Sequence, residues 1–233
     1  MAKKRTSAAA HPLRAYIMSE EAQARRRLSI GGSDANTLMS GDRQRIYELW
    51  LEKRGQGKPQ GDPSINMLMG TATEALNAAW YHFKTGDLVT DMQGFVRDDR
   101  HGYPAHATLD GLCRDSRTVW EAKHTGGYDF GTKAKRTIDT VREQYMPQLQ
   151  HNMMVCGLDT AVLSVFFDNN THDWCEVQAD PFYQDALRFE EAAFWASVQS
   201  GEPPSSIPVI AAPAKITEYR EVDMTGNNEW AVA

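Results

Sequence analysis

The alternation of apolar and polar residues divides the chain into helical and strand-like stretches. Apolar residues at helical spacing predict helices over residues 19–28, 35–50, 66–84, 134–156 and 183–200. Runs rich in β-branched and aromatic residues predict strands over residues 88–97, 105–113, 118–123, 160–168 and 174–178. Helices followed by a cluster of strands that contains one crossover helix indicate a single α/β domain with a mixed sheet.

Two of these helices, over 66–84 and 134–156, have an unusual composition. The helix over 66–84 is apolar on most sides, which predicts that it is buried. Pro147 lies inside the helix over 134–156, where we expect it to kink the helix or to begin a new turn. The segment 54–64 is rich in glycine and proline and is expected to form a loop.

Length and composition are those of a folded globular protein. The 233 residues are 41% hydrophobic and 24% charged, which permits a sizeable core and argues against global disorder. We expect one domain over 13–209, a flexible basic tail at 1–12 and a loosely attached tail at 210–233. No apolar run is long enough to cross a membrane, and no hydrophobic segment follows the basic N-terminus as in a signal peptide. Three scattered cysteines without a CxxC pair point to a reducing cytoplasm.

The charge is distributed unevenly along the chain. The formal net charge is −6, which on its face argues against a nucleic-acid binder. Residues 1–30, however, hold seven basic and two acidic side chains, a local charge of +5. Because a local basic patch can hold a phosphate even in an acidic protein, the negative net charge does not exclude binding of nucleic acid.

A predicted hairpin brings two carboxylates and an ammonium group together. Two β-prone runs flank an RDSR turn, so that Cys113 is expected to face Thr118. In that register Asp110 lies opposite Glu121, with Cβ atoms roughly 4.5–5.5 Å apart. Lys123 shares a face of the strand with Glu121. Such a group fits a magnesium site for phosphodiester hydrolysis, while a solvated charged face of an exposed hairpin remains the alternative.

Two further polar residues lie at positions that need a partner. Glu74 has Gly70 and Ala78 one turn away on either side, which suggests close packing and a glutamate that is either buried and paired or a metal ligand. A surface glutamate is the alternative. Gln148 falls at the edge of an apolar stripe, where its amide either makes a core hydrogen bond or orients a catalytic water or a ligand carboxylate.

The segment RRRLSIGGSDA, residues 25–35, has the chemistry of an anion site. Arginine side chains match phosphate oxygens, a Gly31–Gly32 turn lets backbone N–H groups approach closely, and Ser33 stands at a helix start. Alternatively, the arginines only end one helix favourably and Ser33 only caps the next.

Taken in order, the motifs GGSDA, G-x-x-x-E, LDGLC, WEAK and YMPQLQ resemble those of the YqaJ-type viral recombinase nucleases, the family of phage lambda exonuclease. The resemblance runs from about residue 25 to about residue 155. It implies a restriction-endonuclease-like PD-(D/E)XK fold, with a central mixed sheet flanked by helices, and one nuclease domain over 13–209. Leu109 stands where the family motif has proline, and Pro147 is atypical of the glutamine motif.

The resemblance also implies roles for individual residues. It implies a site for two Mg²⁺ ions, for which Mn²⁺ substitutes, in which Lys123 is the motif lysine and Gln148 lies beside the metals. The implied ligands of the metals are the carboxylates of Glu74, Asp110 and Glu121 and the carbonyl of Ala122. The implied holders of a DNA 5′-phosphate are Ser33 and either Arg26 or Arg27.

The resemblance further implies a magnesium-dependent 5′→3′ exonuclease that degrades one strand of linear double-stranded DNA. The product is a 3′ single-stranded overhang for phage-type homologous recombination by strand annealing. Its implied partners are double-stranded DNA ends, a single-strand annealing protein and further copies of the chain in a trimeric ring, in the cytoplasm of a bacterial host of a phage or prophage, with no membrane. Two alternatives are a DNA-end-binding module of an annealing protein without cleavage and a different PD-(D/E)XK endonuclease.

Overall fold

Two small sheets and six helices make up the part of the chain that the computed structural model describes, residues 18–58, 63–129 and 132–204. The helices are α1 (Glu20–Arg27), α2 (Gly32–Met39), α3 (Arg43–Lys53), α4 (Ile65–Thr85), α5 (Ile138–Cys156) and α6 (Pro181–Ser200). The strands are β1 (Ile30–Gly31), β2 (Val89–Thr90), β3 (Gly94–Asp98), β4 (Ala105–Leu109), β5 (Gly111–Cys113), β6 (Thr118–Thr125), β7 (Thr160–Phe167) and β8 (Thr171–Gln178). The predicted tails at 1–12 and 210–233 lie outside the described residues.

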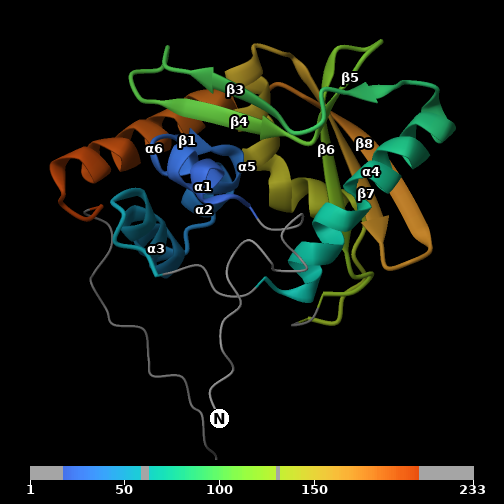
Figure 1. Cartoon of the computed structure of the whole chain (residues 1–233), viewed down its shortest axis with the longest axis horizontal. Helices are drawn as coiled ribbons and strands as arrows, with labels where there is room; N and C mark the ends of the chain where they lie inside the picture. The colour runs from blue at the N-terminus through green and yellow to red at the C-terminus, as the bar shows by residue number, and fades with distance from the viewer. Residues whose placement is uncertain (1–17, 59–62, 130–131, 205–233) are drawn as a thin grey trace, which may run out of the picture.

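The larger sheet has the order β2-β5-β6-β7-β8 and is mixed, as predicted. Its strands β6 and β7 are parallel because the crossover helix α5 joins them, while its other neighbouring strands are antiparallel. Apolar side chains of α5 pack on one face of β6 and β7, and α4 covers the other face. Figure 1 shows α4 beside β6 and β7 on one side of the molecule and α2, α3 and α6 on the other.

The hairpin register agrees with the prediction, but the strand that leads into it is divided. Cys113 pairs with Thr118. The predicted strand over 105–113 is β4 and β5, which belong to different sheets and meet at Asp110. The predicted strand over 88–97 is likewise β2 and β3, separated by a turn in which Asp91 and Gln93 have φ of 51° and 60°. Alternation of residue types cannot reveal a strand that changes sheets, because the period is preserved.

The predicted helix over 35–50 is two helices. Gly41 has a φ of 68° and ends the first, and the Asp42 side chain begins α3 by accepting the N–H of Arg45 at 3.1 Å. The predicted helix over 134–156 is α5, which begins only at Ile138 and continues through Pro147 to Cys156. Among the described helices, none is long and apolar enough to cross a membrane.

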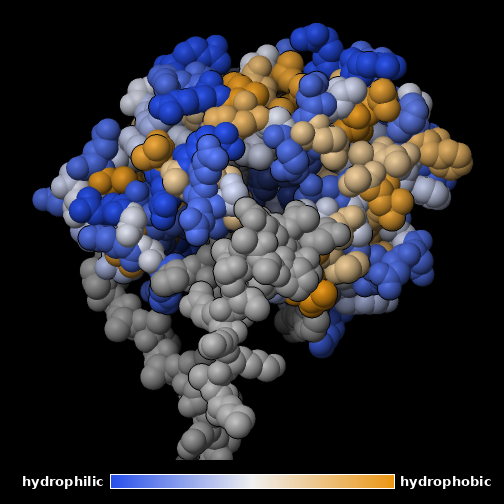
Figure 2. All heavy atoms as spheres, viewed as in Figure 1, coloured by the Kyte–Doolittle hydropathy of each residue, from blue (hydrophilic) through white to orange (hydrophobic). Residues whose placement is uncertain are grey.

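The expectation that the apolar helix over 66–84 is buried is wrong. Only Asn77 and Tyr81 of α4 are fully buried, whereas Leu76 is 60% and Phe83 is 74% exposed. Figure 2 shows apolar surface on the side where Figure 1 places α4. The sheet covers one face of this helix, and no described element covers the opposite one.

A buried polar network fastens α6 to the rest of the core. Glu191 accepts hydrogen bonds from the Tyr103 hydroxyl at 2.6 Å and from His151 Nδ1 at 2.7 Å, and all three side chains are buried. Burial disfavours the charged imidazole, but Glu191 outweighs it and raises the pKa of His151.

We expect Tyr103→Phe to lower the free energy of unfolding by about 1.5–3 kcal/mol, because it leaves one oxygen of a buried carboxylate without its donor. Urea unfolding measures the change. Tyr128→Phe, at a tyrosine that is 62% exposed, is the control. Equal unfolding midpoints for Tyr103→Phe and wild type would mean that this hydrogen bond contributes nothing.

Candidate functional site

The site is built around an open edge of β6. The β5–β6 ladder ends at the pair Gly111–Trp120, so beyond it β5 no longer covers β6. There the Ala122 N–H donates to Asp110 Oδ2 at 2.9 Å. Because the N–H and C=O of one strand residue face the same neighbour, the Ala122 carbonyl points to this edge as well. The break between β4 and β5 thus places a carboxylate and a backbone carbonyl together.

Glu121 is the buried acid of the site. It is 1% exposed and accepts three hydrogen bonds, from the Lys123 ammonium, from Gln148 Nε2 at 2.5 Å and from Asn152 Nδ2 at 3.2 Å. Burial first, and then the nearby Asp110, raise the pKa of Glu121 to about 8, against the effect of Lys123. The charged form of Glu121 therefore needs a cation beside it.

Lys123 supplies one such positive charge. Its side chain is 19% exposed, and its Nζ lies 4.7 Å from the centroid of the Tyr145 ring. Burial disfavours the ammonium, but the carboxylates of Glu121 and Asp110 outweigh it and raise the pKa of Lys123. The lysine is therefore charged at neutral pH, and it lies beside Glu121 as the hairpin register predicted.

Glu74 reaches the same neighbourhood from α4. Its Oε2 accepts a hydrogen bond from Gln93 Nε2 at 2.8 Å. Burial first, and then Asp110, raise the pKa of Glu74 to about 7. The close packing that we expected on both sides of Glu74 is absent at Gly70: a Cβ there would meet no atom within 4 Å, so that glycine faces open space. The sequence did not indicate that Gln93 contacts Glu74. The turn between β2 and β3 brings the two residues together, and no residue pattern predicts that contact.

Two amides of α5 complete the surroundings of Glu121. Gln148 was singled out from the sequence, whereas Asn152 was missed, although it lies four residues later on the same helix face. Helix α2 presses against both of them at Gly32. A Cβ at this glycine would come within 2.6 Å of Asn152 Oδ1 and 2.9 Å of Gln148 Cγ, so only glycine fits without movement.

The donor chemistry of this cluster suits a hard divalent cation. Three carboxylates and a backbone carbonyl supply oxygen ligands, which Mg²⁺ prefers. Within the described ranges, no three Asp, Glu, His or Cys side chains form a ready-made ligand set. The carboxylates do not converge on one point, because like charges repel. Glu74 instead bonds to Gln93, and Glu121 bonds to Lys123 and to the amides of α5. A cation bound in the cluster would compete with these hydrogen bonds for the carboxylate oxygens.

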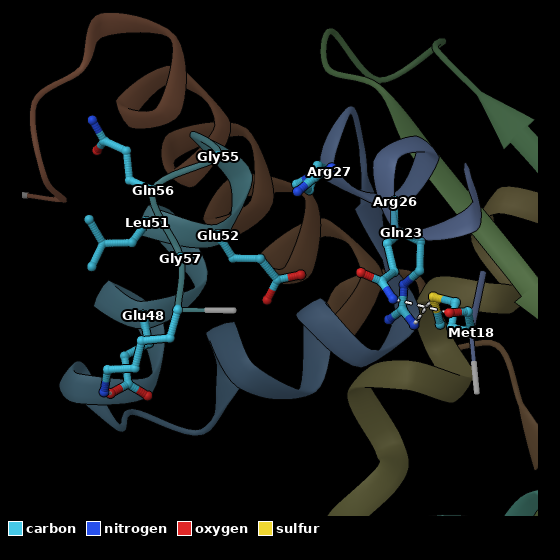
Figure 3. A pocket seen from close by; sticks show the side chains of 11 residues that line it. Met18, Gln23, Arg26, Arg27, Glu48, Leu51, Glu52, Gly55, Gln56 and Gly57 are labelled. Atoms are coloured by element: carbon cyan, nitrogen blue, oxygen red, sulfur yellow. Dashed lines mark hydrogen bonds and ion pairs between the residues drawn. The ribbon is translucent and has the colours of Figure 1, made fainter. Parts of the chain in front are cut away.

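The predicted anion site lies at the corner between α1 and α2. Arg26 Nη2 donates to Ser33 Oγ at 2.5 Å, whereas Arg27 is exposed and, in the described part of the chain, has no hydrogen bond to Ser33. Figure 3 shows the two arginines extending in different directions from α1, and both border a cavity of about 600 Å³ between α1 and α3. The structure thus distinguishes Arg26, which is bonded to Ser33, from Arg27, whereas their spacing in the sequence fitted either residue.

A buried lysine that the sequence analysis missed holds this corner together. Lys53 Nζ donates to the carbonyls of Arg26 at 2.9 Å and Ser29 at 2.8 Å and to Asp34 Oδ2 at 2.5 Å. Asp34 also accepts the Gly31 N–H at 2.8 Å. Burial would raise the pKa of Asp34, but Lys53 outweighs it and the pKa is lowered, so the pair is ionic.

Comparison with known sequences finds relatives over most of this region. A family model described as a YqaJ-like viral recombinase domain matches residues 22–159. The chain is 26% identical over 184 residues to the uncharacterized protein YqaJ of Bacillus subtilis (strain 168). That alignment covers 77% of this chain, and the chain spans only 56% of the length of that relative.

Comparison with solved structures identifies the fold. The alkaline exonuclease LHK-Exo from Laribacter hongkongensis is similar with a TM-score of 0.60 and 21% identity, over 78% of this chain and 94% of that one. Its complex with dAMP gives a TM-score of 0.61. A phage-related exonuclease from Haemophilus somnus 129PT gives 0.56 at 10% identity, over 77% and 96% of the two chains. The predicted PD-(D/E)XK-type fold, a mixed sheet flanked by helices, is confirmed.

Proposed function

Because the chain belongs to the YqaJ-like viral recombinase family, we propose that it is a magnesium-dependent 5′→3′ exonuclease of linear double-stranded DNA. The observation that carries this proposal is the cluster of Asp110, Glu121 and Lys123 at the open edge of β6, with Glu74 beside it. Carboxylates crowded around a single lysine repel phosphate, so a module that only binds DNA has no use for them. The product is a 3′ overhang, the substrate of a single-strand annealing protein.

The proposed chemistry assigns a task to each group. Glu74, Asp110, Glu121 and the Ala122 carbonyl would hold Mg²⁺ or Mn²⁺, since all four donors are hard oxygens. When bound, the metal supplies an activated water and neutralises charge on the phosphate. Lys123 presents an ammonium to the charge that develops during hydrolysis. Gln148 and Asn152 hold the Glu121 carboxylate in place.

The proposed polarity needs a group that distinguishes the two ends of a strand, because metal ions do not. The Arg26–Ser33 pair is our candidate for the 5′-phosphate site. A guanidinium donates two parallel hydrogen bonds to a phosphate, and Ser33 lies in the first turn of α2, where the helix dipole favours an anion. The hydrogen bond from Lys53 Nζ to the Arg26 carbonyl holds the end of α1 in place, so the site does not have to form when a phosphate binds.

We expect Arg26→Ala to remove the preference for 5′-phosphorylated over 5′-hydroxyl ends, which is a loss of roughly 10–100-fold, the value of one charge-assisted contact. Arg27→Ala is the matched control and should keep the preference, since Arg27 is exposed and the described hydrogen bond to Ser33 comes from Arg26. The measurement compares initial cleavage rates on the two kinds of duplex end. An Arg26→Ala enzyme that still prefers the phosphate would remove this residue from the site.

A time course on 5′-phosphorylated linear duplex tests the function itself. With Mg²⁺ we expect one strand to shorten from its 5′ end, and with EDTA no cleavage. Covalently closed circular DNA should stay intact, since it has no end. Cleavage of the circle would identify an endonuclease instead, and binding of ends without any cleavage would identify an end-binding module.

A further inference from the structure

Asn36 joins helix α2 to the candidate active site by two hydrogen bonds. Its Oδ1 accepts the backbone N–H of Gln148 at 2.9 Å, and its Nδ2 donates to Gln148 Oε1 at 3.1 Å. Asn36 is half-buried and comes from a segment 112 residues away in the chain. No sequence motif singled it out, and it lies outside the set of residues to which we have given a role.

Pro147 explains why a side chain from another helix contacts the backbone of α5 at this point. Proline has no N–H, and its ring presses against the carbonyl four residues earlier, that of Glu143. Where the hydrogen bonds of a helix are interrupted, a side chain from elsewhere can insert and bond to the free backbone groups. Here the next N–H, that of Gln148, donates to Asn36. Asn36 therefore supports α5 directly beside the proline.

The same contacts decide which end of the Gln148 amide faces Glu121. A backbone N–H is always a donor, so the atom of Asn36 that accepts it must be the oxygen. The Asn36 nitrogen then faces Gln148 and selects its oxygen. This leaves Gln148 Nε2 to donate to Glu121 Oε1 at 2.5 Å. Without Asn36, Gln148 Oε1 loses this donor, and the contact with Glu121 is left to orient the amide.

Helix α2 also carries the candidate 5′-phosphate site. Ser33 lies three residues before Asn36, on the same side of the helix. Gly32, next to Ser33, is in close contact with Gln148 and Asn152. A small displacement of the first turn of α2 would therefore move Asn36 and press on α5 at the same time.

We propose that Asn36 is a positioning residue that sets the orientation of Gln148 and, through α2, couples occupation of the 5′-phosphate site to the rate of the chemical step. The inference rests on the proposed function. Its consequence is that a 5′-phosphate raises kcat in addition to improving binding, because the occupied end orders the amide that holds Glu121.

The test uses the full chain with Mg²⁺ on 5′-phosphorylated and 5′-hydroxyl duplexes. Asn36→Ala should lower kcat on phosphorylated ends by roughly 10–100-fold, the usual effect of losing a group that orients a metal site, with little change in KM. Asn36→Asp should fall at least as far, since it keeps the acceptor for the Gln148 N–H but cannot donate to Gln148 Oε1. Thr37→Ala is the matched control, since the hydrogen bond that the Thr37 hydroxyl donates among the described residues stays inside α2, at the Ser33 carbonyl, and kcat should stay within about twofold.

A double variant tests the coupling. If Asn36 transmits occupation of the phosphate site, Arg26→Ala should have no further effect on kcat once Asn36 is alanine, whereas independent effects would multiply. Thermal unfolding of each variant shows that the comparison is made on folded protein.

The outcomes separate this inference from the function on which it rests. A wild-type enzyme that cuts phosphorylated ends, with Asn36 variants that keep both kcat and end preference, overturns the inference alone. A rise in KM at unchanged kcat also overturns it, because Asn36 would then act only in binding. A wild-type protein that does not cut duplex DNA with Mg²⁺ overturns the proposed function and this inference with it.

Discussion

Asp110→Asn is expected to abolish cleavage of duplex DNA while the protein remains folded and still binds DNA. The substitution removes one negative charge from the centre of the carboxylate cluster but keeps an oxygen that can accept the Ala122 N–H. Loss of a group at a metal centre costs several kcal/mol of transition-state stabilisation, so we expect the rate to fall by at least about 10³-fold.

Stability should not suffer with this variant. Asp110 raises the pKa of both Glu121 and Glu74, which means that it repels each of these two carboxylates in the absence of a metal ion. Removing the central charge relieves this repulsion, and in EDTA it should also strengthen the binding of DNA, since less negative charge faces the phosphates. Fluorescence anisotropy and thermal unfolding measure both effects.

The matched control is Asp115→Asn, which changes an exposed carboxylate in the turn of the same hairpin and should leave cleavage unchanged. At Glu121 the better substitution is glutamine, because alanine would leave the donors of Lys123, Gln148 and Asn152 without their acceptor. Near-wild-type cleavage by Asp110→Asn would place the chemistry elsewhere in the molecule.

Lys123→Met is expected to lower kcat by about 10²–10³-fold, the effect of removing one oriented donor from a developing charge. Methionine keeps an unbranched side chain beside the Tyr145 ring, so the loss reports on the ammonium group and not on packing. The concentration of Mg²⁺ at half-maximal rate should change little, because Lys123 is not among the proposed ligands.

A titration with Mg²⁺ distinguishes this role from a purely structural one. If a high concentration of Mg²⁺ fully restored the rate of Lys123→Met, the lysine would serve to hold Glu121 in place. A rate that stays low at saturating Mg²⁺ supports a direct action on the reacting phosphate or water.

The hairpin could be read from the sequence because two rules act together. The period of two in a strand and the length of the turn fix the register, and the register fixes which side chains face one another. The pair Cys113–Thr118 follows from these rules and is observed. Asp110 is close to Glu121 as expected, although the ladder ends one pair earlier, at Gly111–Trp120. The fold class followed from the order of helices and strands and from the family motifs.

Other parts depend on contacts between distant segments, which leave no periodic pattern. Lys53, Asn36 and Gln93 reach their partners through tertiary packing, and none of them belongs to a motif. The burial of α4 was mispredicted for a related reason. An apolar helix shows which residues can pack, but not how many neighbours the fold provides to cover them.

The most direct test of the central claim, that the carboxylates at the edge of β6 hold the metal ions, is anomalous diffraction from crystals grown with Mn²⁺. We predict an anomalous peak about 2 Å from oxygens of Asp110 and Glu121, close to the distance of Mg²⁺ from its ligands, with Glu74 and the Ala122 carbonyl around the same site. Mn²⁺ bound only elsewhere, in crystals of a protein that cuts DNA with Mn²⁺ in solution, would contradict this account.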